Sequence, residues 1–298
     1  MTDMTEIPFS IGICAYNEGN NIEKAIRAVY TQELNGFVLD KTIVVSSAST
    51  DNTDDIVRSL MSEYQTLELI VQEKREGKNS AINCFLDSKN TEIVVIINAD
   101  NNLGAPQSLQ KLLEPFRDPK IGIVGGHPIP LNSKKTVAGF ASNMIWSVHH
   151  HIALRYPKIG ELIAYRDIGT RLPTQYQSDE DLIRMNIENA GYLPCYAPDA
   201  IVYNRGPETV ADLKKQRLRV NIGQSYMIKE KNFYNPARDP KVLIGVYWDV
   251  VKDLGFHPIK MTASVLIETQ CRRKAKKMVK KGIKDENVWD PVETTKKI

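Results

Sequence analysis

Short apolar runs alternate with amphipathic segments over the first 130 residues of the chain. The apolar or β-branched runs, which predict strands, lie at residues 8–15, 41–46, 67–72, 92–98 and 121–124. The segments with apolar residues at helical spacing lie at residues 20–31, 51–64, 79–88 and 106–117. Because strands and helices alternate through short loops, this half of the chain predicts an α/β fold with a parallel sheet.

The alternation ends after residue 130. The helices expected beyond it lie at residues 136–155, 179–189, 210–229, 241–255 and 261–281. An extended segment is expected at 193–203, and a polar tail ends the chain. The length of 298 residues and the 42% of hydrophobic residues fit one large domain, or one domain with a C-terminal extension.

Cysteine usage and apolar runs predict the compartment. The four cysteines are scattered, without the spacing of a metal site or a disulfide framework, which is typical of reduced thiols in a cytoplasmic protein. The first ten residues lack the order of a secretory signal. The longest apolar runs, at 121–131 and 242–248, are shorter than the ~20 residues of a membrane span. We therefore expect a cytoplasmic protein that does not cross a membrane but can attach to its inner face.

Positive charge is concentrated near the C-terminus. The chain has a net charge of +3, but residues 271–284 contain eight Lys or Arg and no acid, and subtracting these leaves −5 for the rest. Four apolar residues share one side of a helical wheel for this segment: Ile267, Cys271, Ala275 and Met278. Residues 261–284 therefore indicate either an interfacial helix on an anionic membrane surface or a helix packed on the domain with a solvated basic face. The balanced overall charge argues against a nucleic-acid partner.

Polar and charged residues follow four of the predicted strands. They occupy positions 15–18, 46–53, 74–79 and 98–100. In a parallel sheet the carboxyl ends of the strands meet at one edge, and ligands bind there. We therefore expect these four segments to form one binding site.

Individual residues in these segments have alternative interpretations. Asp100, at the end of a buried strand, is suited to a hard cation that bridges two phosphates, or else it caps a helix. Lys78 follows a glycine at a predicted helix start, where an anion can bind, or it lies in a solvated loop. Asp51 either caps the next helix or bonds a base or ribose. The chain lacks G-x-G-x-x-G after the first strand, a P-loop and a nucleophile elbow, which disfavours those sites.

The segments ICAYNE, VVSSASTDNT, EGKNSAIN and VVIINAD, in this order, resemble the family 2 glycosyltransferases of GT-A fold. The resemblance covers about residues 7–230 and implies a GT-A nucleotide-diphospho-sugar transferase domain at 1–235. Such a domain has a mainly parallel central sheet flanked by helices. A helical, basic and amphipathic C-terminal extension is then expected at 236–298, and its last stretch, 288–296, resembles the tail of archaeal-looking members.

The resemblance also implies a donor site. A nucleoside-diphosphate sugar is the expected donor, and Mg²⁺ or Mn²⁺, bound by Asp100, is the expected cofactor. The residues that the resemblance places around the donor nucleotide are Ala15, Tyr16, Asn17, Glu18, Ser47, Asp51, Lys78, Asn98 and Ala99. Asn98 stands where the metal motif of the family usually has Asp, which removes one charge. Ser46 and Ser47 stand where many members have Asp.

An acidic triplet precedes the helix that ends in Ala-Gly-Tyr at 190–192. Counting back from the glycine aligns Asp179 and Glu180 with the two acids of the family motif, whereas matching by identity selects Glu180 and Asp181. The resemblance thus implies a general base among these three acids, with Glu180 central, that takes the proton of the acceptor hydroxyl. The alternative is the acidic first turn that many helices have.

Two further groups complete the predicted site. Many members of the family hold the leaving diphosphate with residues that match Gln216, Arg217 and Arg219. On the predicted helix at 136–155, Trp146, His149 and His150 indicate either an acceptor wall or a polar helix face with one core histidine. Because of the helical period, His149 and His150 do not face the same way.

These features predict an inverting glycosyltransferase that moves a sugar to an acceptor hydroxyl or phosphate, with the acceptor lipid-linked or close to a membrane. One alternative is a sugar-1-phosphate nucleotidyltransferase, whose Gly-rich, Arg-containing first loop is missing at 15–18. The other is a non-catalytic module that binds a nucleotide sugar or a membrane. Asn98 and Ser46 keep this interpretation open because they stand where members of the family often have Asp.

Overall fold

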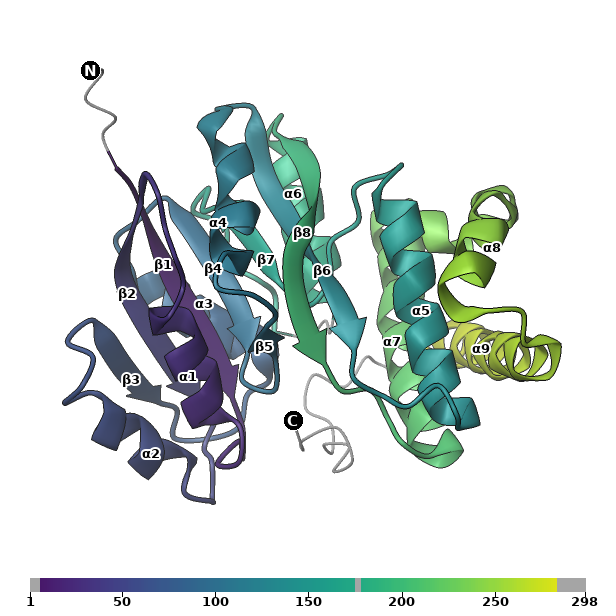
Figure 1. Ribbon diagram of the computed structural model, residues 1–298, viewed down its shortest axis with the longest axis horizontal. Coiled ribbons are helices and arrows are strands. Elements are labelled where there is room, and N and C mark those ends of the chain that lie inside the picture. Colours follow the sequence, from purple (N-terminus) through teal and green to yellow (C-terminus); the bar gives the residue numbers. More distant parts are fainter. Residues whose placement is uncertain (1–5, 175–177, 283–298) are drawn as a thin grey trace.

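A single central sheet organises the part of the chain that the computed structural model describes, residues 6–174 and 178–282. Its strands are β1 (Ile7–Ala15), β2 (Phe37–Ser46), β3 (Leu67–Val71), β4 (Ile93–Asn98), β5 (Asn102–Leu103), β6 (Ile121–Pro130), β7 (Ile163–Arg166) and β8 (Leu193–Asn204). Within the described residues they are ordered β3-β2-β1-β4-β7-β6-β8-β5 across the sheet (Figure 1).

The sheet is parallel where the sequence predicts it and mixed elsewhere. β1 pairs in parallel with β2 and β4, and β2 pairs in parallel with β3, so the carboxyl ends of these four strands share one edge. β7 runs antiparallel to both of its neighbours, β4 and β6. The sequence pattern did not predict β7, because four residues are too few to show an alternation.

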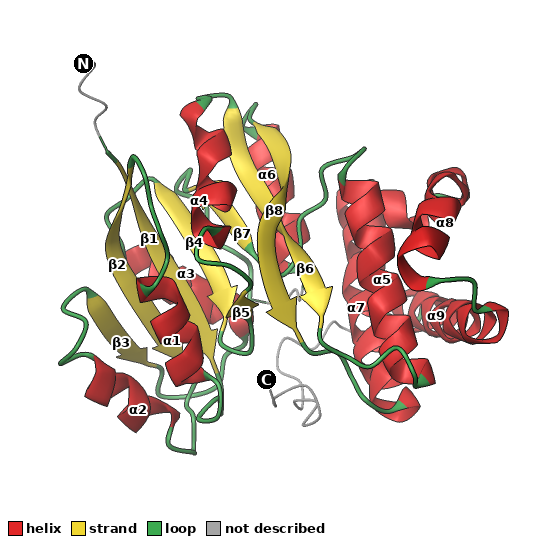
Figure 2. Ribbon diagram, in the orientation of Figure 1, coloured by secondary structure: helices red, strands yellow, loops and turns green. Residues whose placement is uncertain are grey.

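Helices cover both faces of the sheet (Figure 2). They are α1 (Ile22–Tyr30), α2 (Thr53–Leu60), α3 (Lys78–Ser88), α4 (Ser108–Leu113) and α6 (Asp179–Asn189). Val44 of β2 belongs to the apolar core under α1, α2 and α4, whereas its neighbours Ile43 and Val45 belong to the core under α3 and α6. Successive side chains of a strand point to opposite faces, so an almost wholly apolar strand is buried on both. The predicted helix at 106–117 is divided into α4 and a 3₁₀ turn, Glu114–Arg117.

A second group of helices lies beside β6 (Figure 1). It comprises α5 (Val137–Ala153), α7 (Val210–Lys231), α8 (Pro240–Leu254) and α9 (Pro258–Lys280), with a 3₁₀ turn at Pro236–Arg238. The start of α7 is set locally, because the Thr209 hydroxyl accepts a hydrogen bond from the backbone N–H of Asp212 at 3.1 Å. No helix among the described residues combines the length and the apolar character that crossing a membrane requires.

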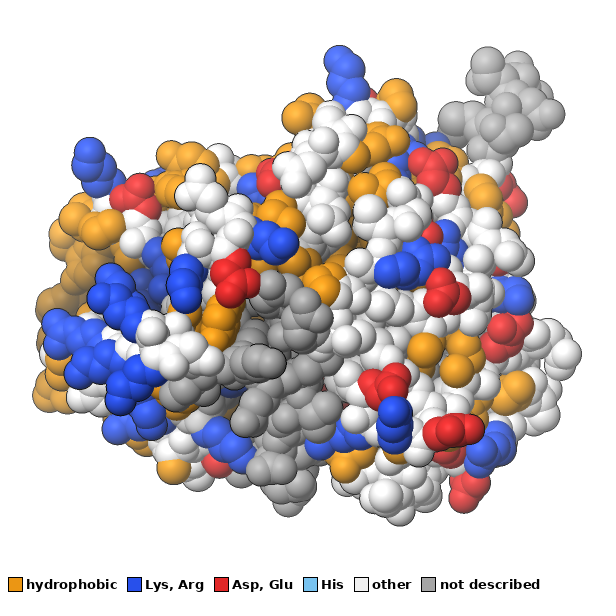
Figure 3. All heavy atoms as spheres, turned by 180° about the vertical axis from the view of Figure 1, so that it is seen from behind, with side chains coloured by type: hydrophobic (Ala, Val, Ile, Leu, Met, Phe, Trp, Pro, Cys, Tyr) orange, Lys and Arg blue, Asp and Glu red, His pale blue; other side chains and the backbone are white. Residues whose placement is uncertain are grey.

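The basic helix α9 packs on the domain. Ile267 and Cys271 are buried in a core with residues of α5 and α7, and Ala275 is buried as well. The apolar stripe of α9 therefore packs on the domain, as one of the two predicted arrangements has it. It is not available to lie on lipid, because α5 and α7 already cover it. The basic side of α9 stays exposed, and Lys and Arg gather at this end of the molecule (Figure 3). Positions 283–284 and the tail at 288–296 lie outside the described residues.

Candidate active site

A cavity of about 1000 Å³ lies where the carboxyl ends of β1, β2 and β4 meet the helices beside β6. The loop after β1 contributes Tyr16 and Glu18, and the end of β4 contributes Asn98 and Asp100. The first turn of α6 contributes all three acids at 179–181. These groups come together because parallel strands end at one edge and α6 begins at the same edge.

Two glycines with positive φ border the helices that carry Lys78 and the acidic triplet. Gly77 has φ 90° at the start of α3, a conformation that favours glycine, and it places Lys78 as the first residue of the helix. Gly191 has φ 91° and ends α6, whose first residue is Asp179. Lys78 Nζ forms an ion pair of 2.7 Å with Asp179 Oδ2, and both side chains are mostly buried. The ion pair connects α3 to α6 across the cavity.

Carboxylates cluster around Asp100. Burial and the nearby carboxylates of Glu161 and Glu18 raise the pKa of Asp100 to about 7. Asn98 Nδ2 donates a hydrogen bond of 2.7 Å to Glu161 Oε2, so the amide orients a neighbouring carboxylate. A divalent cation beside Asp100 would relieve this repulsion, and oxygen is the donor that Mg²⁺ and Mn²⁺ accept.

The donor set fits a cation that is shared with a phosphate ligand. Among the described residues, no group of three or more His, Cys, Asp or Glu side chains is arranged to hold a metal ion. Mg²⁺ in nucleotide sites is usually held by one or two carboxylates together with substrate phosphates. Asp100 fits the role of such a carboxylate, with the remaining ligands supplied by the phosphates and water.

The structure distinguishes the three acids that the sequence left as alternatives. Asp179 is engaged with Lys78. Burial and the charge of Asp179 raise the pKa of Glu180 to about 8. Burial also raises the pKa of Asp181, although Lys158 and Arg184 oppose this shift. A carboxylate with a pKa near neutrality is suited to accept a proton, which favours Glu180 as the base.

Several charged groups of the cavity were not among the predicted site residues, and two of them, Lys158 and Glu161, lie between α5 and β7. Lys158 Nζ lies 3.4 Å from His149 Nδ1, and burial lowers the pKa of the lysine. Gly160 lets this segment approach α5, since an added Cβ would lie 3.0 Å from the His149 ring. The only local sign of this part of the site was Gly160, which lies between Lys158 and Glu161 in the sequence. It did not indicate where the segment lies in space.

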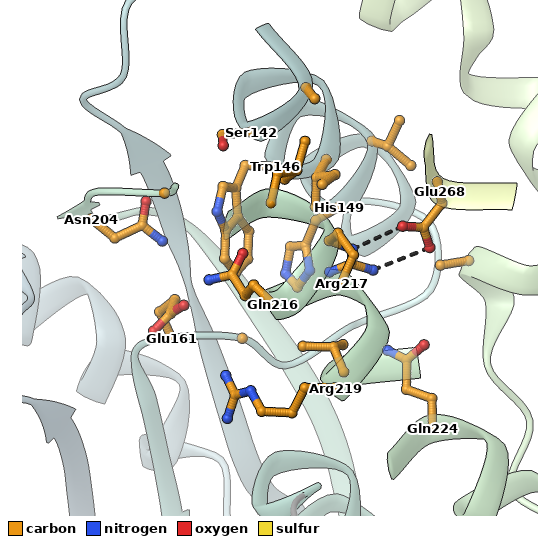
Figure 4. A pocket seen from close by; sticks show the side chains of 18 of the residues that line it. Ser142, Trp146, His149, Glu161, Asn204, Gln216, Arg217, Arg219, Gln224 and Glu268 are labelled. Carbon is orange, nitrogen blue, oxygen red and sulfur yellow. Dashed lines mark hydrogen bonds and ion pairs between the residues drawn. The ribbon is translucent and has the colours of Figure 1, made fainter. Parts of the chain in front are cut away.

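His149 and His150, two of the three consecutive histidines of α5, point in different directions, as the helical period predicts. His149 lines the cavity with Trp146, and their rings meet edge to face at 5.1 Å between centroids (Figure 4). His150 instead stacks on His127, with 4.0 Å between centroids, and contacts the Tyr196 hydroxyl at 2.8 Å. The structure therefore places His150 away from the cavity lining, and only Trp146 and His149 remain in position for an acceptor.

Asn17 and Asp51 connect the loops that border the cavity. Asn17 Oδ1 accepts a hydrogen bond of 2.8 Å from the backbone N–H of Thr50. Asp51 accepts hydrogen bonds from the backbone N–H groups of Gly19 and Thr53, each at 3.0 Å, and so also caps the start of α2. Neither residue is part of the cavity lining. Their hydrogen bonds hold the first two loops in register beside the cavity.

The predicted diphosphate residues lie on α7 and face the cavity (Figure 4). Arg217 turns toward α9, where its Nε and Nη2 donate to the Glu268 carboxylate at 2.8 and 3.2 Å. Arg219 extends toward the side of the cavity where Glu161 lies (Figure 4). Of the two arginines, Arg219 is therefore better placed toward the carboxyl ends of the strands.

Comparison with known proteins identifies the family. Residues 10–175, more than half of the chain, match glycosyl transferase family 2. The chain belongs to this family. The family that its motifs resembled is confirmed.

The curated relatives of this family 2 member are distant in sequence. The probable glycosyltransferase YdaM of Bacillus subtilis is 24% identical over 247 residues, which cover 76% of this chain and 57% of YdaM. The glycosyltransferase AglE of Haloferax volcanii is 27% identical over 122 residues, which cover 41% of this chain and 40% of AglE. The chain thus spans about half the length of the curated relatives that it matches.

Solved structures confirm the GT-A fold. The mannosyltransferase PcManGT from Pyrobaculum calidifontis, solved with GDP-Man and Mn²⁺, has a TM-score of 0.61 at 22% identity, covering 94% of this chain and 81% of that one. The glucosyl-3-phosphoglycerate synthase from Mycobacterium tuberculosis, solved with Mn²⁺, UDP and phosphoglyceric acid, has a TM-score of 0.54 at 17% identity. That match covers 77% of this chain and 80% of the synthase.

Most of the residues predicted for the site of this glycosyltransferase share one cavity. The predicted residues in its lining are Ala15, Tyr16, Glu18, Ser47, Lys78, Asn98, Ala99, Asp100, Trp146, His149, Asp179, Glu180, Asp181, Gln216, Arg217 and Arg219. Asn17, Asp51 and His150 are the predicted residues outside the lining. Asp100 and the acidic triplet, 79 to 81 positions apart in the sequence, border the same space.

Proposed function

We propose that this family 2 glycosyltransferase moves a sugar from a nucleoside-diphosphate sugar to an acceptor hydroxyl or phosphate, with inversion at the anomeric carbon. The observation that carries the proposal is the shared cavity of Asp100 and the acidic triplet at 179–181. One carboxylate is placed for a cation and another for a proton, as a single displacement with a diphosphate leaving group requires.

For a hydroxyl acceptor, the proposed step is a direct displacement. The Glu180 carboxylate accepts the proton of the acceptor hydroxyl while the acceptor oxygen forms a bond to the anomeric carbon. The bond from that carbon to the diphosphate breaks on the opposite face, and the nucleoside diphosphate leaves with the electron pair. The ion pair of Lys78 with Asp179, at 2.7 Å, supports this role because it occupies the first acid and leaves the second to act as base.

The rest of the cavity supplies charge and surfaces. When bound, Mg²⁺ or Mn²⁺ at Asp100 would neutralise charge on the leaving diphosphate. Gln216 and Arg219 on α7 supply donors for the same group. Tyr16, whose ring lies under the Arg75 guanidinium at 3.9 Å, offers a flat surface for the nucleotide. Trp146 and His149 form the opposite wall, where we place the acceptor.

Release of a nucleoside diphosphate tests the reaction. The full chain is incubated with a panel of UDP- and GDP-sugars and Mn²⁺ or Mg²⁺, and the released diphosphate is measured. Glu180→Gln should lower kcat about 10²- to 10⁴-fold with donor affinity retained. The control is Glu188→Gln, on the same helix and paired with Arg184, and it should retain activity. Diphosphate released from a nucleoside triphosphate and a sugar phosphate would instead favour a nucleotidyltransferase, and donor binding without turnover would favour a non-catalytic module.

We also propose that the acceptor is presented at an anionic membrane surface. Large apolar side chains are exposed around the turn between α8 and α9, among them Trp248 at 68%, Phe256 at 64% and Ile259 at 84%. The exposed basic side of α9 lies at the same end of the molecule, beside exposed apolar side chains (Figure 3). Apolar groups flanked by cations favour attachment to an anionic bilayer.

Vesicle sedimentation tests this attachment. The full chain should sediment with phosphatidylcholine vesicles that contain phosphatidylglycerol and stay in solution with phosphatidylcholine alone. Serine at both Trp248 and Ile259 should abolish sedimentation, whereas Val38→Ser, at an exposed site on β2, should not. A wild-type chain that remains in the supernatant with anionic vesicles would contradict the membrane proposal.

A further inference from the structure

The cavity continues from the acidic triplet into an apolar limb between α5, α8 and α9. Its walls are formed mainly by aliphatic and thioether side chains, including Met144, Val148, Leu243, Val246, Val250 and Met261. Several of these side chains are themselves buried, such as Val246 at 1% and Val250 at 3% exposure. Val246, Val250 and Met261 belong to the apolar core between α5, α8 and α9, so this core forms the walls of the limb.

The apolar limb reaches the surface at the turn between α8 and α9. Phe256, Val265 and Leu266 line the cavity and are also 64%, 54% and 56% exposed. Side chains that belong to both the lining and the outer surface mark a mouth. The same cavity therefore borders both these exposed side chains and the wall formed by Trp146 and His149.

A cationic cluster lines the same cavity as the apolar limb and the acids. Arg217 and Arg272 both donate to the single carboxylate of Glu268, at 2.8 Å each, and all three residues line the cavity. Arg238 lies nearby, with its Nη2 donating to Asn221 Oδ1 at 2.9 Å. Two guanidinium groups, Arg217 and Arg272, share the one carboxylate of Glu268, so these three residues carry a net positive charge. Such a cluster is complementary to a phosphate or another anionic head group.

We propose that the apolar limb binds the hydrocarbon chain of a lipid acceptor whose anionic head group lies at the Arg217–Arg272 cluster. The inference rests on the proposed function, because it assigns the acceptor class of the same cavity. The polar end of such a molecule would lie toward Glu180, and its chain would extend through the mouth between α8 and α9. An acceptor with an apolar chain and an anionic head matches a cavity whose lining combines an aliphatic limb with a cationic cluster, whereas a fully polar glycan would leave the limb's apolar walls unpaired.

Binding of n-alkyl phosphates tests the limb without any turnover. Isothermal titration of the full chain with a series from butyl to dodecyl phosphate, below the micellar concentration, measures affinity against chain length. Each two added methylenes should raise the affinity about tenfold until the limb is filled. Affinity that does not change with chain length would overturn the proposal.

A substitution at the mouth separates the limb from the outer surface. Val265→Glu, at an exposed position of the lining, should lower dodecyl phosphate affinity at least tenfold and leave butyl phosphate affinity unchanged. Ile244→Glu introduces the same charge on α8, outside the lining and 74% exposed, and should change neither affinity. Equal losses in both variants would mean adsorption to the apolar surface and would overturn the proposal.

The donor reaction is measured in parallel. Release of the nucleoside diphosphate in the absence of a lipid acceptor is measured for the wild type and for Ile244→Glu, which lies outside the lining and should retain it. Loss of chain-length dependence with donor release intact would reject the lipid subsite alone. Absence of donor release in the wild type, with chain-length dependence present, would reject the proposed transferase reaction and leave the hydrocarbon site standing.

Discussion

Replacing Glu268 by Gln tests how α9 is held to α7. Glu268 of α9 accepts hydrogen bonds from Arg217 of α7 and from Arg272, and its side chain is 18% exposed. Glutamine keeps the size and one acceptor oxygen of the side chain but removes the charge. The substitution therefore measures the electrostatic contribution of the carboxylate.

The magnitude follows from the titration of the carboxyl group. Burial alone would raise the pKa of Glu268, but the Arg217 and Arg272 guanidinium groups hold it down to about 2, against 4.5 for the free side chain. A difference of about 2.5 pKa units corresponds to about 3 kcal/mol. A carboxyl group with a depressed pKa stabilises the fold fully above the unfolded value, and this contribution is lost as the pH falls toward 2.

Urea unfolding measures this contribution. At pH 7 the Glu268→Gln variant should be less stable than the wild type by about 3 kcal/mol, or by about 5 °C in Tm for a chain of 298 residues. At pH 3 the difference should shrink to less than half. The control is Glu23→Gln, because Glu23 and Arg27 form an exposed pair that should contribute less than about 1 kcal/mol. Equal effects of the two substitutions, or an effect of Glu268→Gln that does not change with pH, would refute this reasoning.

Three further predictions concern the cavity. Because the pKa of Glu180 is raised to about 8, kcat/KM should increase with pH along a limb with an apparent pKa near 8, and a flat profile from pH 6 to 9 would exclude it as the base. Asp100→Asn should abolish the Mn²⁺ dependence of nucleoside-diphosphate binding in a calorimetric titration, whereas Asp118→Asn, directly after the 3₁₀ turn that follows α4, should retain it. Lys78→Met leaves the mostly buried Asp179 carboxylate unpaired and should lower the free energy of unfolding by about 3 kcal/mol at pH 7, and a variant as stable as the wild type in urea would show that the ion pair does not contribute.

Several features of the molecule could be predicted from the sequence because they depend on residues that are close together in the chain. The apolar runs predicted β1, β2, β3 and β4, since a strand buried on both faces is marked by its own residues. The end of α6 followed from Gly191, and the helix at 179–189 was predicted with the bounds that the structure has. Parallel strands end at one edge, so placing Tyr16 and Asp100 in one site required only that the sheet be parallel.

Other features depended on the order of strands and helices in space. Glu161 reaches Asn98, 63 positions away, because β7 inserts antiparallel between β4 and β6, and nothing local to either residue specifies that insertion. The wheel of α9 identified its apolar stripe but not the surface that covers it, which α5 and α7 supply. Sequence periodicity reports which side of a segment is apolar, whereas the partner of that side is decided by long-range packing, in which each element buries its apolar surface against whichever neighbour the topology brings alongside.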